Sequence, residues 1–436
     1  MKSVKIGLLG LGTVGGGTAT VLLRNRDEIS RRIGCSLEVV HAAAHGIGQQ
    51  TILDPAKCKL TEDGFEVVNN PEVDIVVELI GGYTIARELV LKAIENGKHV
   101  VTANKALIAL HGNEIFKAAN KQGVIVAYEA AVAGGIPIIK AVREGLAANR
   151  IEWIAGIING TGNFILTEMK EKSRDFSDVL KEAQELGYAE ADPTFDVEGI
   201  DAAHKLTILA SLAFGIDLQF EKTFTEGISK ITQEDVTYAE ELGYRIKHLG
   251  IARKTAKGIE MRVHPTLIPE KRLIANVNGV MNAVLVKADA VGPTLYYGAG
   301  AGAEPTASAV VADLVDVARA MDTDKQSRVA LLGFQPESIS DIPVLDHDEF
   351  ETAYYLRMLA DDRPGVLADI TRIFADQEIS IEAVIQKEPQ ENQTCVPLIL
   401  LTSVVVEKNM NAAIKQIESL DVIKGQVTRI RMEHLG

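Results

Sequence analysis

The stretch VKIGLLGLGTVG, residues 4–15, decides the fold of the first part of the chain. A short apolar run leads into a glycine-rich turn that opens a helical sequence. Glycines there permit a tight turn and let backbone N–H groups approach a pyrophosphate, which the helix N-terminus attracts. The alternative is a turn that serves backbone geometry alone. The context of strand before and helix after predicts dinucleotide binding, with contacts at Gly10, Gly12, Thr13, Val14 and Gly15.

Strand and helix patterns alternate up to about residue 130. The helical stretch Ile85–Asn96 is followed by Gly97, the residue expected at a helix C-cap. Nearly continuous β-branched apolar runs indicate strands that are buried on both faces. These runs are Val4–Leu9, Leu37–Ala44, Val73–Ile80, His99–Thr102 and Val124–Tyr128. The alternation predicts an α/β fold, a Rossmann-type doubly wound parallel sheet over residues 1–134.

Beyond this region the pattern changes to a mixture of helices and strands. Helical segments are predicted at Phe176–Leu186 and Ala202–Phe214. The predicted strands are Trp153–Ile158, Glu260–Leu267 and Ala283–Lys287. We expect residues 135–304 to form an α+β domain for substrate binding and dimerisation. The long helix Ala307–Met321, within residues 305–330, should pack back on the first domain.

The last part of the chain has its own pattern. Residues 335–350 contain two prolines with acidic residues and serines, which is typical of a linker. Residues 351–436 then follow the order strand–helix–strand–strand–helix–strand. This order predicts a small ferredoxin-like βαββαβ unit.

Composition excludes several classes of protein. The formal net charge of −15 disfavours a nucleic-acid partner, because phosphate binding needs a basic surface. The three cysteines are far apart, which excludes a cysteine-built zinc site and a disulfide framework and is typical of a reducing cytoplasm. The apolar runs are too short for a membrane span. A cytoplasmic enzyme that acts on a small molecule is expected.

The residue type at the end of the second predicted strand should determine whether the enzyme prefers NAD or NADP. An acid there would hold a ribose 2′-hydroxyl, whereas a basic group would meet a 2′-phosphate. This chain has AAHG at residues 43–46, with no acid. His45 either contacts the phosphate or is a solvated histidine at the strand end. The missing carboxylate favours NADP.

Two lysines have positions that favour a role in the active site over an ordinary place on the solvent-exposed surface. Lys105 follows the predicted strand His99–Thr102, and ligands of doubly wound sheets lie beyond the carboxyl ends of strands. Asp201 and Lys205 are four residues apart in a helical run and share one face. An exposed pair of this kind contributes only about 0.3–0.5 kcal/mol. Here the pair opens an apolar helix, so we expect it to face a cleft.

Acidic residues just before this helix could receive a substrate ammonium. They are Glu190, Asp192 and Asp196. Together with the dinucleotide turn and the lysines, they predict hydride transfer between a nicotinamide and a small polar substrate.

With these motifs the sequence resembles homoserine dehydrogenase, in order and over nearly the whole chain. The matching stretches are Gly10–Gly15, Val76–Gly82, Thr102–Leu107, Tyr128–Pro137, Asn159–Asn163, Gly187–Pro193, Asp201–Leu206, Val263–Leu267 and Tyr297–Ala309. The combination of Lys105, Glu190 and the Asp201–Lys205 pair is highly specific. The loop at residues 362–368 resembles that of an ACT domain, a fold used to bind amino acids.

The resemblance implies NAD(P)H-dependent interconversion of L-aspartate 4-semialdehyde and L-homoserine, in threonine and methionine biosynthesis. It makes Lys205 the proton donor, lets Lys105 assist at the reacting oxygen, and gives substrate binding to Glu190 and Asp201. The chemistry agrees, because hydride arriving at an aldehyde carbon builds negative charge on oxygen, which an ammonium stabilises and protonates.

The resemblance also implies further ligand contacts. The cofactor would contact Gly81, Lys105 and Gly302, and the family commonly has arginine where His45 stands, so the choice between NAD and NADP stays open. A monovalent cation, sodium, would bind at one carboxylate and a bend of carbonyls. Its ligands would be Glu129 and the backbone oxygens of Val132, Gly134 and Ile136. The alternative is a buried, hydrogen-bonded glutamate without an ion.

The C-terminal unit is expected to regulate and not to catalyse. The loop Asp361–Gly365 joins a strand to a helix expected to begin near Pro364, where free N–H groups could take a carboxylate. The resemblance implies a pathway amino acid as effector, threonine first, and such units often pair edge to edge. We therefore expect a homodimer or homotetramer. A tight turn without a ligand is the alternative.

Two other functions compete with this interpretation. An aspartate-semialdehyde dehydrogenase-like enzyme needs a cysteine nucleophile, and Cys35, Cys58 and Cys395 lie outside the predicted catalytic region. A dinucleotide-binding amino-acid sensor without catalysis gives no reason for Lys105 and Lys205 to converge.

Overall fold

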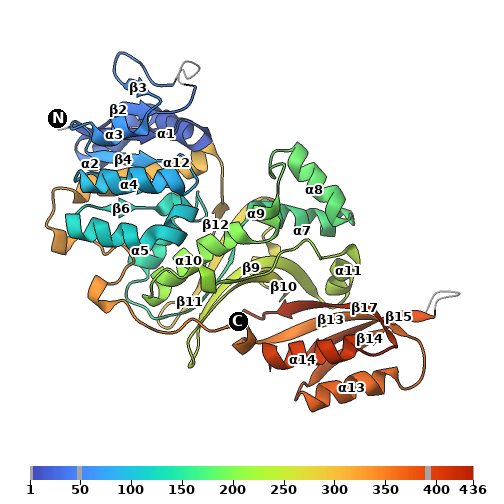
Figure 1. The fold of residues 1–436 in the computed structure, drawn as a ribbon. Coiled ribbons are helices and arrows are strands. Elements are labelled where there is room, and N and C mark those ends of the chain that lie inside the picture. The colour runs from blue at the N-terminus through green and yellow to red at the C-terminus, as the bar shows by residue number, and fades with distance from the viewer. Residues whose placement is uncertain (1–2, 47–51, 388–393, 436) are drawn as a thin grey trace.

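The computed structural model describes residues 3–46, 52–387 and 394–435. Its three parts follow one another along the chain. Figure 1 places the N-terminal part at one end, a large central sheet beside it, and the C-terminal part at the other end.

The N-terminal part is built on a six-stranded sheet in the order β3-β2-β1-β4-β5-β6. All paired neighbours in it run parallel. Its strands are β1 (Ser3–Leu9), β2 (Ser36–Ala43), β3 (Lys59–Thr61), β4 (Ile75–Glu78), β5 (His99–Thr102) and β6 (Val126–Ala127). The order reverses at β1 and the two halves extend in opposite directions, so the predicted doubly wound fold is confirmed.

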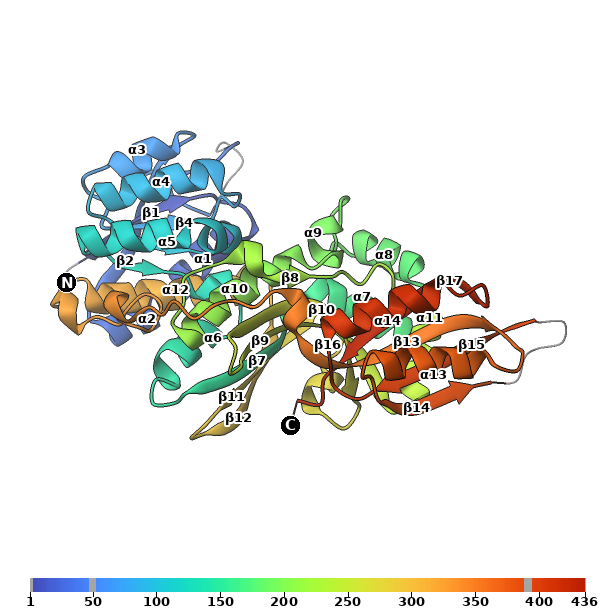
Figure 2. The same ribbon diagram turned by 60° about the horizontal axis from the view of Figure 1, so that its bottom comes forward.

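Helices cover both faces of this sheet. They are α1 (Thr13–Arg24), α2 (Arg26–Ile33), α3 (Gly64–Asn69), α4 (Thr84–Glu95), α5 (Lys105–Gln122) and, from much later in the chain, α12 (Ala303–Ala320). Helix α12 packs along α1, as Figure 2 also shows. The contact is so close that a Cβ at Gly17 would lie 2.5 Å from the Ala303 carbonyl oxygen. Helix α12 therefore lies against the first part of the chain.

The central part carries most of an 11-stranded sheet in the order β12-β11-β7-β9-β10-β17-β13-β15-β14. The strands from the central part are β7 (Ile151–Ile157), β9 (Tyr244–Lys254), β10 (Ile259–Pro269), β11 (Met281–Ala288) and β12 (Gly292–Ala299), with the short β8 (Phe224–Thr225) beside β10. Its helices are α6 (Ile138–Lys140), α7 (Gly160–Lys172), α8 (Phe176–Glu185), α9 (Thr194–Val197), α10 (Ile200–Phe214) and α11 (Gln233–Glu241).

The C-terminal part has the predicted βαββαβ order. Its elements are β13 (Glu351–Asp361), α13 (Val366–Asp376), β14 (Ile381–Gln386), β15 (Cys395–Thr402), α14 (Glu407–Glu418) and β17 (Ile423–Met432), with a short β16 (Val405–Val406) that pairs with β13. Helix α13 begins at Val366 after Gly365 as N-cap, so Pro364 lies outside it and not at the predicted first helical position.

This part is not a separate unit on a tether. Strand β17 pairs in parallel with β10, through Thr266 with Arg431 and Leu267 with Met432. One apolar core contains residues of both parts, among them Phe164 and Ile399. The central and C-terminal parts therefore share a sheet and a core.

The segment expected to be a linker, residues 335–350, is packed against the central part. The Pro343 carbonyl accepts a hydrogen bond from Ile259 N at 2.9 Å, and Leu345 N donates to the Ile259 carbonyl at 2.9 Å. Val344 and Phe350 are buried. The expectation that this segment is a linker is wrong, because it packs on β10 while the C-terminal part joins the central sheet directly.

Within residues 3–46, 52–387 and 394–435, no helix is both long enough and apolar enough to cross a bilayer.

Candidate active site

The turn after β1 has the geometry that a pyrophosphate requires. Gly10 has a φ of +94°, and a Cβ there would lie 2.7 Å from the Leu79 carbonyl oxygen. A Cβ at Gly15 would lie 2.0 Å from the Gly10 carbonyl oxygen. Gly12, the N-cap of α1, faces open space, and Thr13 is exposed. The start of α1 therefore follows a tight turn that requires glycine at positions 10 and 15, and a helix start of this kind fits the pyrophosphate of a dinucleotide.

The neighbouring loops at the carboxyl edge of the sheet are held by Glu78. Its carboxylate accepts hydrogen bonds from Ile80 N at 2.8 Å, from Gly81 N at 3.2 Å and from Thr102 Oγ1 at 2.6 Å. These bonds tie the end of β4 to the end of β5. Gly81 itself has a φ of +79°.

Two further predicted cofactor residues lie at the same edge. Gly302 is the N-cap of α12, with a φ of +122°. His45 is exposed just beyond the end of β2. An acid from the end of the neighbouring strand β3 comes near it, because Glu62, which follows Thr61, accepts a hydrogen bond at its Oε1 from Gly46 N at 3.3 Å.

Lys105 is the first residue of α5, whose N-cap is Asn104. Its ammonium crosses from the N-terminal part to the central part, where it lies 3.2 Å from Asp201 Oδ1 and 5.9 Å from the ring centroid of Phe195. This lysine therefore places a positive charge of the N-terminal part against a buried carboxylate of the central part.

Helix α10 brings the predicted pair together. Its N-cap, Gly199, has a φ of +83°, and Asp201 and Lys205 follow one turn apart. Lys205 Nζ donates to Asp201 Oδ2 at 2.6 Å and to the Ile158 carbonyl at 2.8 Å. Asp201 is 3% exposed and Lys205 9%. The expectation that these charges face a cleft and not bulk water is met.

Asp201 holds a negative charge between two positive ones. Burial opposes its ionised form, but the ammoniums of Lys205 and Lys105 and the hydrogen bonds that it accepts hold the pKa of Asp201 below its ordinary value. For Lys205, burial lowers the pKa, and repulsion from Lys105 adds to this effect against the attraction of Asp201. A lysine of this kind can exchange a proton at a lower pH than a surface lysine.

Asn159 is a site residue to which sequence reasoning gave no role. Its Nδ2 donates to Asp196 Oδ1 at 2.8 Å and to Asp201 Oδ2 at 2.9 Å. Its Oδ1 accepts from Gly162 N at 2.7 Å and so caps α7. The signal was an asparagine between an apolar strand and a helix, which is a common N-cap position. The hydrogen bond from Asn159 to Asp201 on α10 joins distant segments, so no local sequence pattern indicates it.

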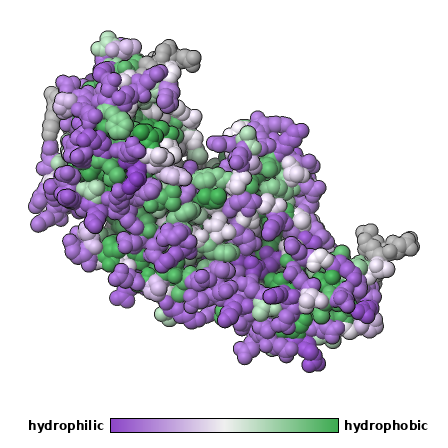
Figure 3. All heavy atoms as spheres, in the orientation of Figure 1, coloured by the Kyte–Doolittle hydropathy of each residue, from purple (hydrophilic) through white to green (hydrophobic). Residues whose placement is uncertain are grey.

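Asn159 and the charged groups around Asp201 line one cleft of about 450 Å³. Lys105, Lys205, Asp201, Asp196 and the exposed Glu190 lie on its walls, together with Gly302 from the start of α12. Burial raises the pKa of Asp196, and the charge of Asp201 adds to this effect. In Figure 3 a notch separates the N-terminal lobe from the lobe that carries α8 and α9. Asp192, the third acid considered, does not line the cleft.

The predicted cation residues form a buried bend after β6. Glu129 accepts hydrogen bonds from Ile139 N and Lys140 N, both at 2.8 Å, and its own N–H donates to Asp313 at 2.8 Å. Burial raises the pKa of Glu129 to about 7. The pKa of Asp313 is raised well above its ordinary value, first by burial and then by the charge of Glu129.

The backbone oxygens of this bend fit a hard cation. Val132, Gly134 and Ile136 are buried. Among the residues described, no hydrogen bond reaches the carbonyls of Val132 and Gly134, whereas that of Ile136 accepts from Ile138 N at 2.7 Å. Two buried carboxyl groups and free carbonyls provide the oxygen ligands that hard cations prefer.

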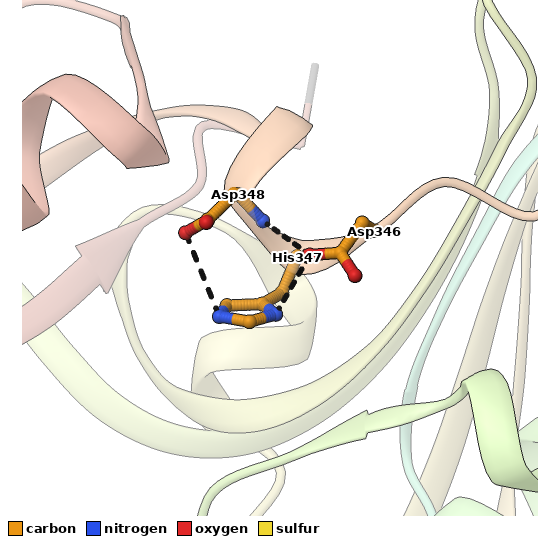
Figure 4. A group of neighbouring side chains, drawn as sticks. All are labelled: Asp346, His347 and Asp348. Carbon is orange, nitrogen blue, oxygen red and sulfur yellow. Dashed lines mark hydrogen bonds and ion pairs between the residues drawn. The ribbon is translucent and has the colours of Figure 1, made fainter.

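Other reactive groups lie elsewhere. Cys35 and Cys58 are buried in the N-terminal core, and burial raises the pKa of Cys58 to about 11, so the described wall of the cleft offers no thiolate. Figure 4 shows Asp346, His347 and Asp348 gathered on the surface before β13. The Asp346 side chain already caps a short turn there, so the cluster has a structural role.

Comparison with known proteins identifies the family. A family model for the homoserine dehydrogenase NAD-binding domain matches residues 10–129, one for homoserine dehydrogenase matches residues 137–315, and one for the ACT domain matches residues 354–422. A homoserine dehydrogenase of Pseudomonas aeruginosa is 66% identical over 436 residues, which is 100% of each chain. One of Neisseria gonorrhoeae is 59% identical over 435 residues, again 100% of each chain.

Solved structures agree with these matches. The crystal structure of a homoserine dehydrogenase from Thiobacillus denitrificans superposes with a TM-score of 0.96 at 66% identity, covering 100% of this chain and 99% of that one. A hyperthermophilic archaeal homoserine dehydrogenase in complex with NADPH gives a TM-score of 0.62 at 25% identity, covering 72% of this chain and 98% of that one. The chain thus belongs to the homoserine dehydrogenase family, as an oxidoreductase with an NAD-binding domain, a catalytic domain and a C-terminal ACT domain.

Proposed function

We propose that the cleft interconverts L-aspartate 4-semialdehyde and L-homoserine with a nicotinamide dinucleotide. The observation that carries this proposal is the meeting of Lys105 and Lys205 on one buried carboxylate, Asp201, between the two sheets. The test is to follow nicotinamide absorbance with L-homoserine and either dinucleotide. L-2-aminobutyrate, which lacks the hydroxyl group, is the control. Failure to reduce either dinucleotide with L-homoserine would overturn the proposal.

Lys205 is the proton donor in this scheme. Its Nζ uses two of its three N–H bonds on Ile158 and Asp201, which leaves one for the substrate oxygen. As negative charge develops on that oxygen, the ammonium stabilises it and then transfers a proton. Lys105 adds a second positive charge on the cofactor side. The bound nicotinamide supplies or accepts the hydride.

The substrate is held by charges and dipoles of opposite sign. Glu190 and Asp196 line the cleft and take the ammonium group. The N-terminus of α7, at Gly160 and Thr161, takes the carboxylate, because the first N–H groups of a helix have no partner within it. Asp201 already accepts hydrogen bonds or ion pairs from both lysines and from Asn159. Its part is therefore to position the lysines, with any substrate contact secondary.

We expect NADP(H) to work at least as well as NAD(H), because His45, and no acid, follows the end of β2. The NADPH complex of the archaeal relative supports this choice. The carboxylate of Glu62, held beside Gly46, opposes a 2′-phosphate. His45→Asp should move the ratio of kcat/KM values toward NAD(H), and Glu62→Gln toward NADP(H). A wild-type enzyme that strongly prefers NAD(H), with neither variant changing the ratio, would show that other groups select the cofactor.

A sodium ion at Glu129, Val132, Gly134 and Ile136 is part of the proposal. The supporting observation is the pair of buried carboxyl groups, Glu129 and Asp313, beside free carbonyls. A cation there would favour the ionised form of Glu129 and hold the bend that leads into α6.

Stability should then depend on sodium and pH together. The pKa of Glu129 rises from 4.5 to about 7 on folding, so without sodium the protonated carboxyl stabilises the fold below pH 4.5 and this contribution is lost as the pH rises through 7. At about 1.4 kcal/mol per pH unit the effect is about 3 kcal/mol. Sodium should raise the melting temperature most at neutral to alkaline pH, with choline chloride as the ionic-strength control. Glu129→Gln should abolish the difference; an equal sodium effect in this variant would contradict the site.

The ACT domain is proposed to respond to an amino acid, threonine first, at the loop of Asp361 and Gly365. Gly365 has a φ of +97° and faces open space at the start of α13, where the first N–H groups have no partner within the helix. Asp361 lies 3.2 Å from Lys424 Nζ and accepts from Cys395 Sγ at 3.3 Å. A pathway amino acid would inhibit by binding one conformation of the enzyme more tightly than another.

A continuous path of contacts joins this domain to the catalytic helix. Arg431 of β17 donates to Glu226 Oε2 at 2.7 Å. The Glu226 carbonyl bonds to His248 Nε2 at 2.9 Å. The ring of His248 lies 2.9 Å from the position of a Cβ at Gly199, the N-cap of α10. A shift of β17 would therefore reach Asp201 and Lys205 through packed groups.

A homodimer or homotetramer is proposed on the basis of the sheet edge. Strand β12 ends the order of the 11-stranded sheet, and Tyr297 on it is 58% exposed. Val291, in the preceding turn, is 51% exposed. Unpaired edge strands and exposed apolar side chains favour association with a second copy.

A further inference from the structure

Asn282 is a polar residue of the cleft that the proposed reaction leaves without a role. It lies at the start of β11, and its side chain lines the same cleft as Lys105 and Lys205. It is only 1% exposed. A polar side chain this deeply buried normally has a hydrogen-bond partner.

No such partner is found for Asn282 Oδ1 within the described part of the chain. The atom is fully buried and accepts no hydrogen bond from a described residue. An unpaired buried acceptor costs about 1–3 kcal/mol. A side chain that keeps this penalty at the wall of a catalytic cleft is expected to gain a partner when the cleft is filled.

The side chain is confined between two glycines that belong to different halves of the cleft. A Cβ at Gly300 would lie 2.1 Å from Asn282 Nδ2, and a Cβ at Gly160 would lie 3.7 Å from Asn282 Oδ1. Gly300 belongs to the turn that leads into α12, beside the dinucleotide helix α1. Gly160 opens α7 on the substrate side. The amide thus lies where the nicotinamide and the substrate would meet.

The polar groups of the two ligands show whether Asn282 would bind the nicotinamide or the substrate. Each polar group of the amino-acid substrate already has a partner in the proposed scheme: acids for the ammonium, the start of α7 for the carboxylate, and lysines for the reacting oxygen. The carboxamide of the nicotinamide has none. It offers one acceptor and two N–H donors, which an asparagine side chain complements with its own donor and acceptor.

We propose that Asn282 positions the nicotinamide ring by hydrogen bonding to its carboxamide, an inference that rests on the proposed dehydrogenase function. A fixed carboxamide fixes the rotation of the ring about its glycosidic bond, and so the ring face that points at the substrate carbon. Small errors in such an alignment reduce hydride transfer strongly.

Binding measurements with an altered cofactor test the inference. The 3-acetylpyridine analogue of the dinucleotide replaces the carboxamide NH2 by a methyl group. Calorimetric Kd values are compared for both dinucleotides in the wild type, in Asn282→Ala and in Asn276→Ala. Asn276 is the control, because it is bonded within its own turn and does not line the described cleft. One hydrogen bond in a buried site corresponds to about a 5–150-fold change in Kd.

We expect Asn282→Ala to raise the Kd of the natural dinucleotide by such a factor and to leave the Kd of the analogue nearly unchanged. The difference in affinity that the wild type shows between the two dinucleotides should then disappear. Gly300→Ala, which displaces the amide, should reproduce this loss if Asn282→Ala is unstable. Equal weakening of both dinucleotides, or a raised KM for homoserine with unchanged Kd values, would overturn the inference. A wild type that binds neither dinucleotide would instead refute the proposed function.

Discussion

Replacing Lys205 with alanine is expected to lower kcat by about 10²–10⁴-fold in both directions, because the variant lacks the proposed general acid and base. The Kd of the dinucleotide should change little, since Lys205 lies on α10 in the central part and not among the N-terminal dinucleotide loops. Stopped-flow single-turnover rates, which separate chemistry from product release, are the measurement. Near-normal hydride transfer in this variant would remove Lys205 from the mechanism.

Lys205→Arg provides a sharper contrast. Arginine can keep the charge beside Asp201, but it does not release its proton at accessible pH. We expect it to restore much of the folding stability and little of the turnover. If arginine restored turnover as well, charge alone and not proton transfer would be the contribution of this residue.

The pH dependence of the wild type follows from the same group. Homoserine oxidation needs a neutral amine, so its rate should rise with pH through the pKa of Lys205, and semialdehyde reduction should fall. Burial and Lys105 lower that pKa, so the midpoint should lie below that of an ordinary lysine. A flat oxidation profile would contradict the assignment.

The parts of this site that the sequence predicts are those whose residues lie close together along the chain. The i,i+4 spacing of Asp201 and Lys205 required only a helix to bring them together, and the apolar residues that follow required that helix to be buried. The glycine turn at Gly10 likewise depends on its immediate neighbours. The meeting of Lys105 with Asp201 is a contact between distant segments, and only the family resemblance anticipated it.

The missed elements have physical reasons. Strand β9 (Tyr244–Lys254) contains Arg245, Lys247 and His248 and does not look like a buried strand. Yet Lys247 is 3% exposed, because Asn163, Val277 and Asn278 accept its hydrogen bonds. Acceptors from elsewhere in the chain make the burial of Lys247 possible, and the local periodicity of β9 does not reveal them. Edge strand β3 is too short for a pattern.

The same limit explains the most consequential error, the expected independence of the C-terminal part. Its own pattern is a complete βαββαβ unit, and nothing local shows that the last strand pairs with β10 more than 160 residues earlier. Buried charges reinforce this junction. Arg262 and Arg253 donate to the carboxylate of Glu433 at 2.5 and 2.7 Å, and Arg431 bonds to Glu407.

Truncation near Gln335 is therefore expected to abolish activity through loss of the fold, whereas a true linker at residues 335–350 would leave an active remnant. Removal of residues 336–436 leaves the fully buried Arg262 without Glu433 and exposes an apolar core. Losing one partner of a buried ion pair costs about 3–5 kcal/mol, a large part of a total stability of about 5–15 kcal/mol. Solubility, circular dichroism melting and turnover of residues 1–335 are the measurements. A soluble, active fragment would mean that the shared sheet contributes little.

Regulation must then be tested in the full chain. Gly365→Ala places a side chain at a φ of +97° in the proposed effector loop, and Gly243→Ala places one at +78° in a turn of the central part. Both positions face open space, so the backbone strain is similar, and any general destabilisation should be shared. We expect both variants to keep turnover without threonine, and only Gly365→Ala to lose inhibition by threonine. Inhibition that persists in Gly365→Ala would place the effector elsewhere. Loss of threonine inhibition in both variants would mean that backbone strain in general, and not a change in the loop at Gly365, disrupts the inhibition.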